Sequence, residues 1–105
     1  METPNMSYIN SMSGGNEEFE KKLIAIIKSE FPFEKQVYFD NIANQNYKLA
    51  AENVHKLKHK ISILGLEKSY EIAVAFENNL LEEITELKEE FESILMTMTN
   101  YLQKL

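Results

Sequence analysis

Residues 47–65 read YKLAAENVHKLKHKISILG and carry the clearest helical pattern in the chain. Their apolar positions recur three or four residues apart, which places them on one face of an α-helix. These positions are Ala50, Val54, Leu57, Ile61 and Leu64. Gly65 directly follows and is a natural C-terminal stop. The stretch therefore predicts a helix over about residues 47–65 with one buried face.

The preceding segment predicts another helix. Asn16 is followed by three glutamates within four residues, which is typical of an N-cap and an acidic first turn. An apolar stripe then recurs at helical spacing, formed by Phe19, Leu23, Ile26 and Ile27. Proline disfavours the α conformation at the residue before it, so we expect a pause or bend at Pro32. The pattern resumes, and the Asn-rich residues 40–46 predict a connection to the next helix.

Two helical segments are expected after Gly65. The first carries a stripe of Ser69, Ala73, Phe76 and Leu80. The second is predicted as one long amphipathic helix over residues 81–105, with fraying over residues 97–101. Its apolar stripe comprises Ile84, Leu87, Phe91, Ile94, Leu95, Met98 and Leu102.

No segment shows the alternation typical of a strand, so the predicted fold class is all-α. The economical architecture is an antiparallel four-helix bundle over residues 16–105. Residues 1–15 are small and polar for the most part and predict an N-terminal arm with a short extra helical element.

Composition excludes several functions. The formal net charge of −6 disfavours nucleic acid as a partner, and every basic side chain is Lys rather than Arg. Cysteine is absent, which excludes disulfides and thiolate chemistry. The N-terminus lacks the pattern of a signal peptide, and no run approaches the roughly 20 apolar residues of a membrane span. We therefore expect a cytoplasmic protein with no membrane partner.

The face opposite the buried stripe of residues 47–65 carries the candidate chemistry. It comprises Ala51, His55, Lys58, His59 and Ser62. No acidic residue lies between Asn53 and Leu66, so this stretch is locally positive in an acidic chain. A solvent-facing neutral imidazole is a nucleophile, and Lys58, one turn from His55, can pair with phosphoryl oxygens. These residues predict a phosphate acceptor.

At these residues the sequence resembles the histidine-containing phosphotransfer (HPt) family. The resemblance rests on His55-Lys56-Leu57-Lys58, then Leu64-Gly65, then Phe76-Glu77. Residues 13–19, SGGNEEF, are similar to the segment that opens the first long helix in many members. The resemblance spans about residues 8–80.

The resemblance implies that His55 accepts a phosphoryl group from a receiver-domain aspartyl phosphate and passes it to another receiver. It implies that Lys58 stabilises the phosphohistidine, and that Ala51, His59 and Ser62 belong to the docking face. The expected partners are response-regulator receiver domains and a hybrid sensor histidine kinase. The receiver would supply Mg²⁺, so the chain needs no cofactor of its own. The chain has three glycines and no glycine-rich ATP-binding region, so we expect a phosphoryl carrier without ATP-dependent kinase activity.

One position departs from the family pattern, and two other functions stay open. Many members have glycine where this chain has His59, which can swing aside, donate a hydrogen bond to the phosphoryl group, or mark a chain that no longer transfers phosphate. The first two are favoured. His55 and His59 at i, i+4 could hold a transition metal, although no Asp, Glu or Cys lies suitably near in sequence. The main alternative is a helical adaptor that binds a partner through the His55 face without covalent chemistry.

Overall fold

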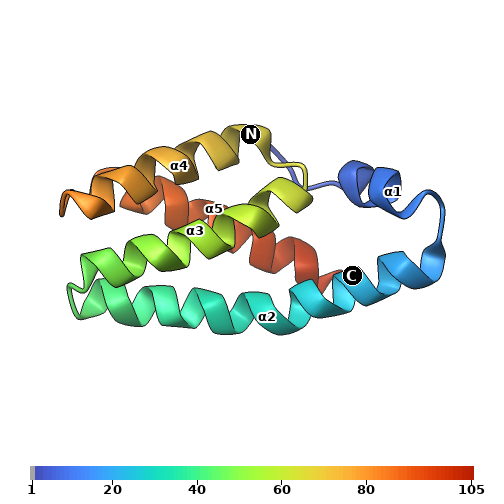
Figure 1. Cartoon of the computed structure of the whole chain (residues 1–105), viewed down its shortest axis with the longest axis horizontal. Coiled ribbons are helices and arrows are strands. Elements are labelled where there is room, and N and C mark those ends of the chain that lie inside the picture. Colours follow the sequence, from blue (N-terminus) through green and yellow to red (C-terminus); the bar gives the residue numbers. More distant parts are fainter. Residues whose placement is uncertain (1) are drawn as a thin grey trace.

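The computed structural model describes residues 2–105 and contains five α-helices in an elongated body of 43 × 23 × 19 Å (Figure 1). The helices are α1 (Ser7–Ser13), α2 (Glu17–Ala43), α3 (Tyr47–Ile63), α4 (Glu67–Leu81) and α5 (Lys88–Gln103). No residue in this range forms a strand, which confirms the all-α prediction. Within the same residues no helix is both long and apolar enough to cross a membrane.

The start of α2 is the one predicted. The side chain of Asn16 accepts a hydrogen bond from the backbone N–H of Phe19 at 3.1 Å, and three glutamates occupy the first turn. This capping satisfies an N–H group that has no partner inside the helix, and the acidic turn complements the helix dipole.

The predicted pause at Pro32 is wrong, because α2 runs without interruption through this residue to Ala43. Proline removes one intrahelical hydrogen bond and crowds the preceding turn. Phe31 and Tyr38, on either side of it, are 2% and 0% exposed. Burial of both side chains in the core offsets the cost of the proline, so the helix continues through it. The expected connection over residues 40–46 shrinks accordingly to residues 44–46.

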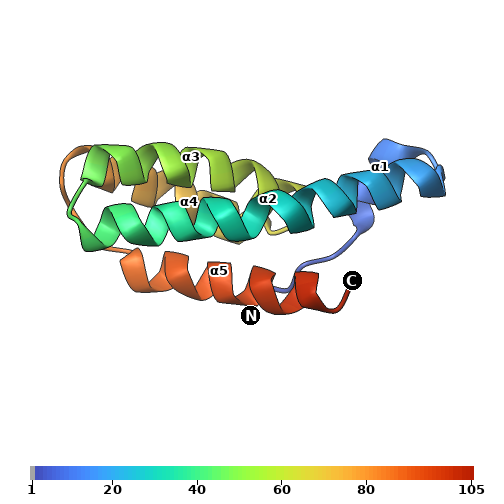
Figure 2. The same cartoon turned by 90° about the horizontal axis from the view of Figure 1, so that it is seen from below.

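Helix α3 packs against both α2 and α4 (Figures 1 and 2). On the α2 side, the Lys60 ammonium lies 3.0 Å from a Glu30 oxygen and 2.9 Å from a Glu34 oxygen. Burial alone would lower the pKa of Lys60, but the hydrogen bonds and charges of Glu34 and Glu30 raise it above its usual value. Near the C-terminus of α2, the side-chain amide of Asn41 donates a hydrogen bond to the side-chain oxygen of Asn53 of α3 at 2.6 Å. The two helices therefore run in opposite directions.

The apolar core is shared by all five helices. All four residues of the predicted stripe in α4, Ser69 among them, are buried. Tyr38 is fully buried among aromatic rings and its hydroxyl donates to Glu92 at 3.1 Å. Burial and the Glu92 carboxylate raise the pKa of Tyr38 well above its usual value.

The predicted long helix over residues 81–105 is shorter than expected. Residues 82–87 form a turn in which Glu83 and Leu87 have positive φ angles of 61° and 75°. Asn79 holds this turn, accepting the N–H of Ile84 at 2.8 Å and donating its side-chain amide to the carbonyl of Glu86 at 3.2 Å. Ile84 is consequently 39% exposed rather than part of the buried stripe. The chain needs these residues outside a helix to reverse from α4 into α5.

The predicted fraying over residues 97–101 is also wrong, since α5 continues to Gln103. Thr99 donates to the Leu95 carbonyl at 2.8 Å and accepts a hydrogen bond from Lys35 of α2 at 2.9 Å. Met98 and Leu102 are buried. Contacts with α2 therefore outweigh the modest helix propensity of this segment.

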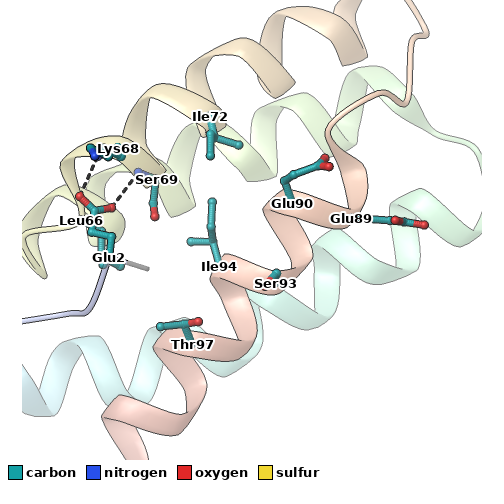
Figure 3. Close-up of a pocket in the computed structure, with 10 residues that line it drawn as sticks. All are labelled: Glu2, Leu66, Lys68, Ser69, Ile72, Glu89, Glu90, Ser93, Ile94 and Thr97. Atoms are coloured by element: carbon teal, nitrogen blue, oxygen red, sulfur yellow. Dashed lines mark hydrogen bonds between the residues drawn. The ribbon is translucent and has the colours of Figure 1, made fainter.

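The described part of the N-terminal arm contains the expected short helical element, α1, whose Ile9 is fully buried. Before it, the Glu2 carboxylate accepts the backbone N–H groups of Lys68 at 2.8 Å and Ser69 at 2.9 Å at the start of α4 (Figure 3). Burial opposes ionisation, but these hydrogen bonds hold the pKa of Glu2 below its usual value. Glu2 thus serves as the missing N-cap of α4.

Candidate functional site

His55 lies at the middle of α3 and faces solvent. Its side chain is 55% exposed, whereas the neighbouring stripe residues Val54, Leu57 and Ile61 are fully buried. His59, one turn further along the helix, is also exposed. The predicted orientation of His55 is therefore confirmed.

Two other residues of the predicted face are less exposed than expected. Ala51 is only 2% exposed, so its expected exposure is wrong, and the Lys58 side chain is 12% exposed. The reason is that α3 is covered by α2 on one side and by α4 on the other. The buried arc is therefore wider than the apolar stripe alone indicates. Ser62 remains exposed.

Glu77 of α4 connects the two residues singled out by the sequence. Its Oε2 atom lies 3.1 Å from Nδ1 of His55, and its Oε1 atom lies 2.8 Å from Nζ of Lys58. The carboxylate is 18% exposed and the Lys58 ammonium also lies 5.9 Å from the ring centroid of Tyr70. One partly buried carboxylate thus holds both side chains.

This contact decides which nitrogen of His55 is free to react. A carboxylate only accepts hydrogen bonds, so the proton of the neutral ring belongs on Nδ1, next to Glu77. Nε2 then carries the unshared electron pair. The nucleophilic nitrogen therefore lies on a half-exposed ring. The hydrogen bond to Glu77 of α4 restrains the rotation of this ring.

His59 stands against this ring. The two imidazoles meet edge to face, with centroids 5.4 Å apart and planes inclined by 88°. His59 therefore occupies space beside the candidate nucleophile. Among residues 2–105, no three His, Cys, Asp or Glu side chains gather as a group that could hold a metal ion.

A shallow hollow of about 430 Å³ lies beside His55. It is lined by Ala51, Glu52, His55, Lys56, Glu77 and Leu81. Lys56 shares this hollow with the imidazole, whereas Lys58 forms an ion pair with Glu77. A separate groove of about 450 Å³ between α4 and α5 is lined by other residues (Figure 3).

Sequence reasoning did not assign Glu77 to the site. The signal was present, because Phe76-Glu77 belongs to the pattern on which the family resemblance rests. Glu77 lies 22 residues after His55, so spacing along one helix could not connect the two side chains. No protein-family model, curated protein or solved structure matches this chain.

Proposed function

We propose that this chain is a histidine phosphotransfer protein in which His55 carries the phosphoryl group between two receiver-domain aspartates. The observation that carries the proposal is the hydrogen bond from His55 to Glu77, with the ring half exposed. A carrier needs a nucleophile that a large partner can reach and that is already oriented. Both properties meet at this residue.

The reaction is a displacement at phosphorus. Nε2 of His55 attacks the aspartyl phosphate, an N–P bond forms, and the P–O bond to the aspartate breaks. The aspartate carboxylate leaves with the electron pair of that bond. The Nδ1 proton stays on the ring, where the negative charge of Glu77 stabilises the positive imidazolium. Transfer to the second receiver is the reverse of these steps, with Mg²⁺ supplied by the receiver.

We assign different roles to the two nearby lysines. Lys58 pairs with Glu77 and is mostly covered, so it acts chiefly by holding that carboxylate in place. Lys56 lines the hollow beside His55 and can meet the phosphoryl oxygens as a point charge. At about 4 Å and an effective dielectric near 20, such a charge contributes about 4 kcal/mol before desolvation is subtracted.

The same proposal takes α2 to α5 as an antiparallel four-helix bundle and places the protein in the cytoplasm with its partners. His55 is the ninth of 17 residues in α3, far from either helix end. A mid-helix position suits a carrier, because rigid elements hold reacting groups more accurately than loops do.

The test is incubation with a receiver domain that bears radiolabelled aspartyl phosphate, in the presence of Mg²⁺. We expect acid-labile, base-stable label on the wild type and none on His55→Gln. His59→Gln is the matched control, because it removes a neighbouring imidazole from the same face and should still take up label. Label on His55→Gln would contradict the proposal.

A binding assay with the same receiver separates the adaptor alternative. If the wild type binds the receiver but takes up no label, and His55→Gln binds equally well, the chain is a non-covalent adaptor. If His55→Gln binds but only the wild type takes up label, the phosphotransfer proposal holds.

A further inference from the structure

The outer side of α2 carries a row of large apolar side chains. Phe19, Ile26 and Phe33 are 43%, 51% and 72% exposed. Phe19 and Ile26 belong to the predicted apolar stripe but lie on the exposed side of the helix, while Ile27 and Phe31 face the core. Seven residues make two helical turns, so the three side chains follow one line about 21 Å long. Figure 2 shows α2 from below, and no other helix covers its near side.

Two charged residues flank this row symmetrically. Lys22 precedes Ile26 by four positions and is exposed, and Glu30 follows it by four positions with a side chain that is 53% exposed. At 100° per residue they lie on opposite sides of the row. Apolar patches rimmed by polar residues on a soluble protein mark interaction sites.

We propose that this row is the interface of a two-fold symmetric homodimer in which α2 packs antiparallel against α2 of a second copy, with Ile26 on the axis. With the two-fold axis at Ile26, a residue that precedes Ile26 by a given number of positions lies opposite the partner residue that follows Ile26 by the same number. Phe19 then meets Phe33 of the partner subunit. Lys22 meets Glu30 of the partner subunit, and the symmetry forms each contact twice.

The charges of Lys22 and Glu30 favour a second copy of the chain as the partner, and they favour antiparallel packing. A parallel pair in register would place Lys22 against the partner's Lys22 and Glu30 against the partner's Glu30, which repel. The antiparallel pair turns both repulsions into attractions. Glu30 already accepts from Lys60, but a carboxylate has about four acceptor positions and can accept from a second lysine.

The dimer leaves the His55 site open, because the His55–Glu77 contact is made between α3 and α4 rather than on the outer side of α2. The proposal therefore does not depend on phosphotransfer. The oligomeric state of the free protein tests it directly.

The first test is the mass of the full chain in solution as its concentration rises. We expect a mass that approaches twice 12.2 kDa for the wild type. Ile26→Glu should stay at the monomer mass. Leu49→Glu is the matched control, since Leu49 of α3 is 50% exposed and its variant should still dimerise. A wild type that remains monomeric at all concentrations overturns the proposal and leaves the row for a different partner.

The second test reads the direction of packing by cysteine cross-linking, which is clean because the chain has no cysteine of its own. Helix axes 8–10 Å apart bring facing Cα atoms to about 4–5 Å, within disulfide range. Ile26→Cys should therefore form a disulfide-linked dimer.

Two further variants distinguish antiparallel from parallel packing. Lys22→Cys or Glu30→Cys alone should not cross-link, because the two copies of each lie about 12 Å apart along the helix. A mixture of these two variants should cross-link. Cross-linking of Lys22→Cys alone would show a parallel pair and overturn the antiparallel arrangement.

Discussion

Glu77 on α4 lies 3.1 Å from the Nδ1 atom of His55 on α3, although the two residues are 22 positions apart in the chain. Its other carboxylate oxygen lies 2.8 Å from the Lys58 ammonium. The contact between two helices therefore sets the orientation of the exposed imidazole. The same contact also predicts how the site responds to substitution.

Glu77→Gln should slow phosphotransfer on the order of tenfold, equivalent to about 1.4 kcal/mol in activation free energy. The glutamine amide oxygen can still accept a hydrogen bond from the Nδ1–H group but carries no charge to stabilise the imidazolium. The measurement is the initial rate of label transfer from a phosphorylated receiver. Glu71→Gln, an exposed change on the same helix, should leave this rate unchanged. An unchanged rate in Glu77→Gln would refute the role of the carboxylate.

His59→Ala should speed label transfer, because it removes the ring that stands 5.4 Å from the His55 ring and gives the receiver more room. His59→Gly should do the same while lowering the free energy of unfolding by about 1 kcal/mol, the usual cost of glycine in a helix. The rate of label transfer in both variants measures how easily the receiver reaches His55. Urea unfolding of the same variants measures the change in the free energy of unfolding. Slower transfer in both would identify His59 as a hydrogen-bond donor instead.

Lys60→Met should lower the free energy of unfolding at pH 7 by about 1–3 kcal/mol, since it leaves Glu34 partly buried without its partner. The pKa of Lys60 is higher in the folded chain than its usual 10.5. The contribution of Lys60 to the free energy of unfolding is therefore full below about pH 10.5. It is lost as the pH rises through the pKa of Lys60 in the folded chain.

Urea unfolding between pH 9 and pH 12 checks this dependence. Lys60→Met should lose less stability over this range than the wild type. Some alkaline loss should remain in both, because the pKa of Tyr38 is also raised by folding. Equal losses in the two proteins would show that Lys60 does not contribute.

Gly65→Ala should destabilise the fold more than Gly14→Ala. Both glycines have positive φ, 77° and 59°, which costs a residue with a side chain roughly 1–2 kcal/mol. A Cβ atom on Gly65 would also lie 2.6 Å from the side-chain amide of Asn5, whereas one on Gly14 meets open space. Thermal unfolding of both variants measures the difference, and equal shifts would argue against the contact with Asn5.

Glu2→Gln should lower the free energy of unfolding by about 0.5–1 kcal/mol at pH 7, because it removes a negative charge from the start of α4. The pKa of Glu2 is lowered by folding, so this contribution is present above its usual value of 4.5 and is lost as the pH falls through the folded pKa. Unfolding curves of the two proteins should therefore converge at acid pH. A constant difference down to pH 2 would contradict the role of the charge.

Local patterns in the sequence determined the helical content, the N-cap of α2 at Asn16, and the inward stripes of α3 and α4. These features depend on residues three or four positions apart, which a single helix brings together whatever surrounds it. His55 belongs to this group, because its exposure follows from the stripe opposite it.

Tertiary structure decided the rest. Pro32 stays inside α2 because Phe31 and Tyr38 are buried on both sides of it, and α5 begins only at Lys88 because the chain must first reverse. Ala51 is buried, and Phe19 and Ile26 are exposed, because a periodic pattern gives the direction of a face but not how far neighbouring helices extend over it. The contact of Glu77 with His55 likewise exists only once α3 and α4 pack together, since no spacing along one helix can bring residues 55 and 77 into contact.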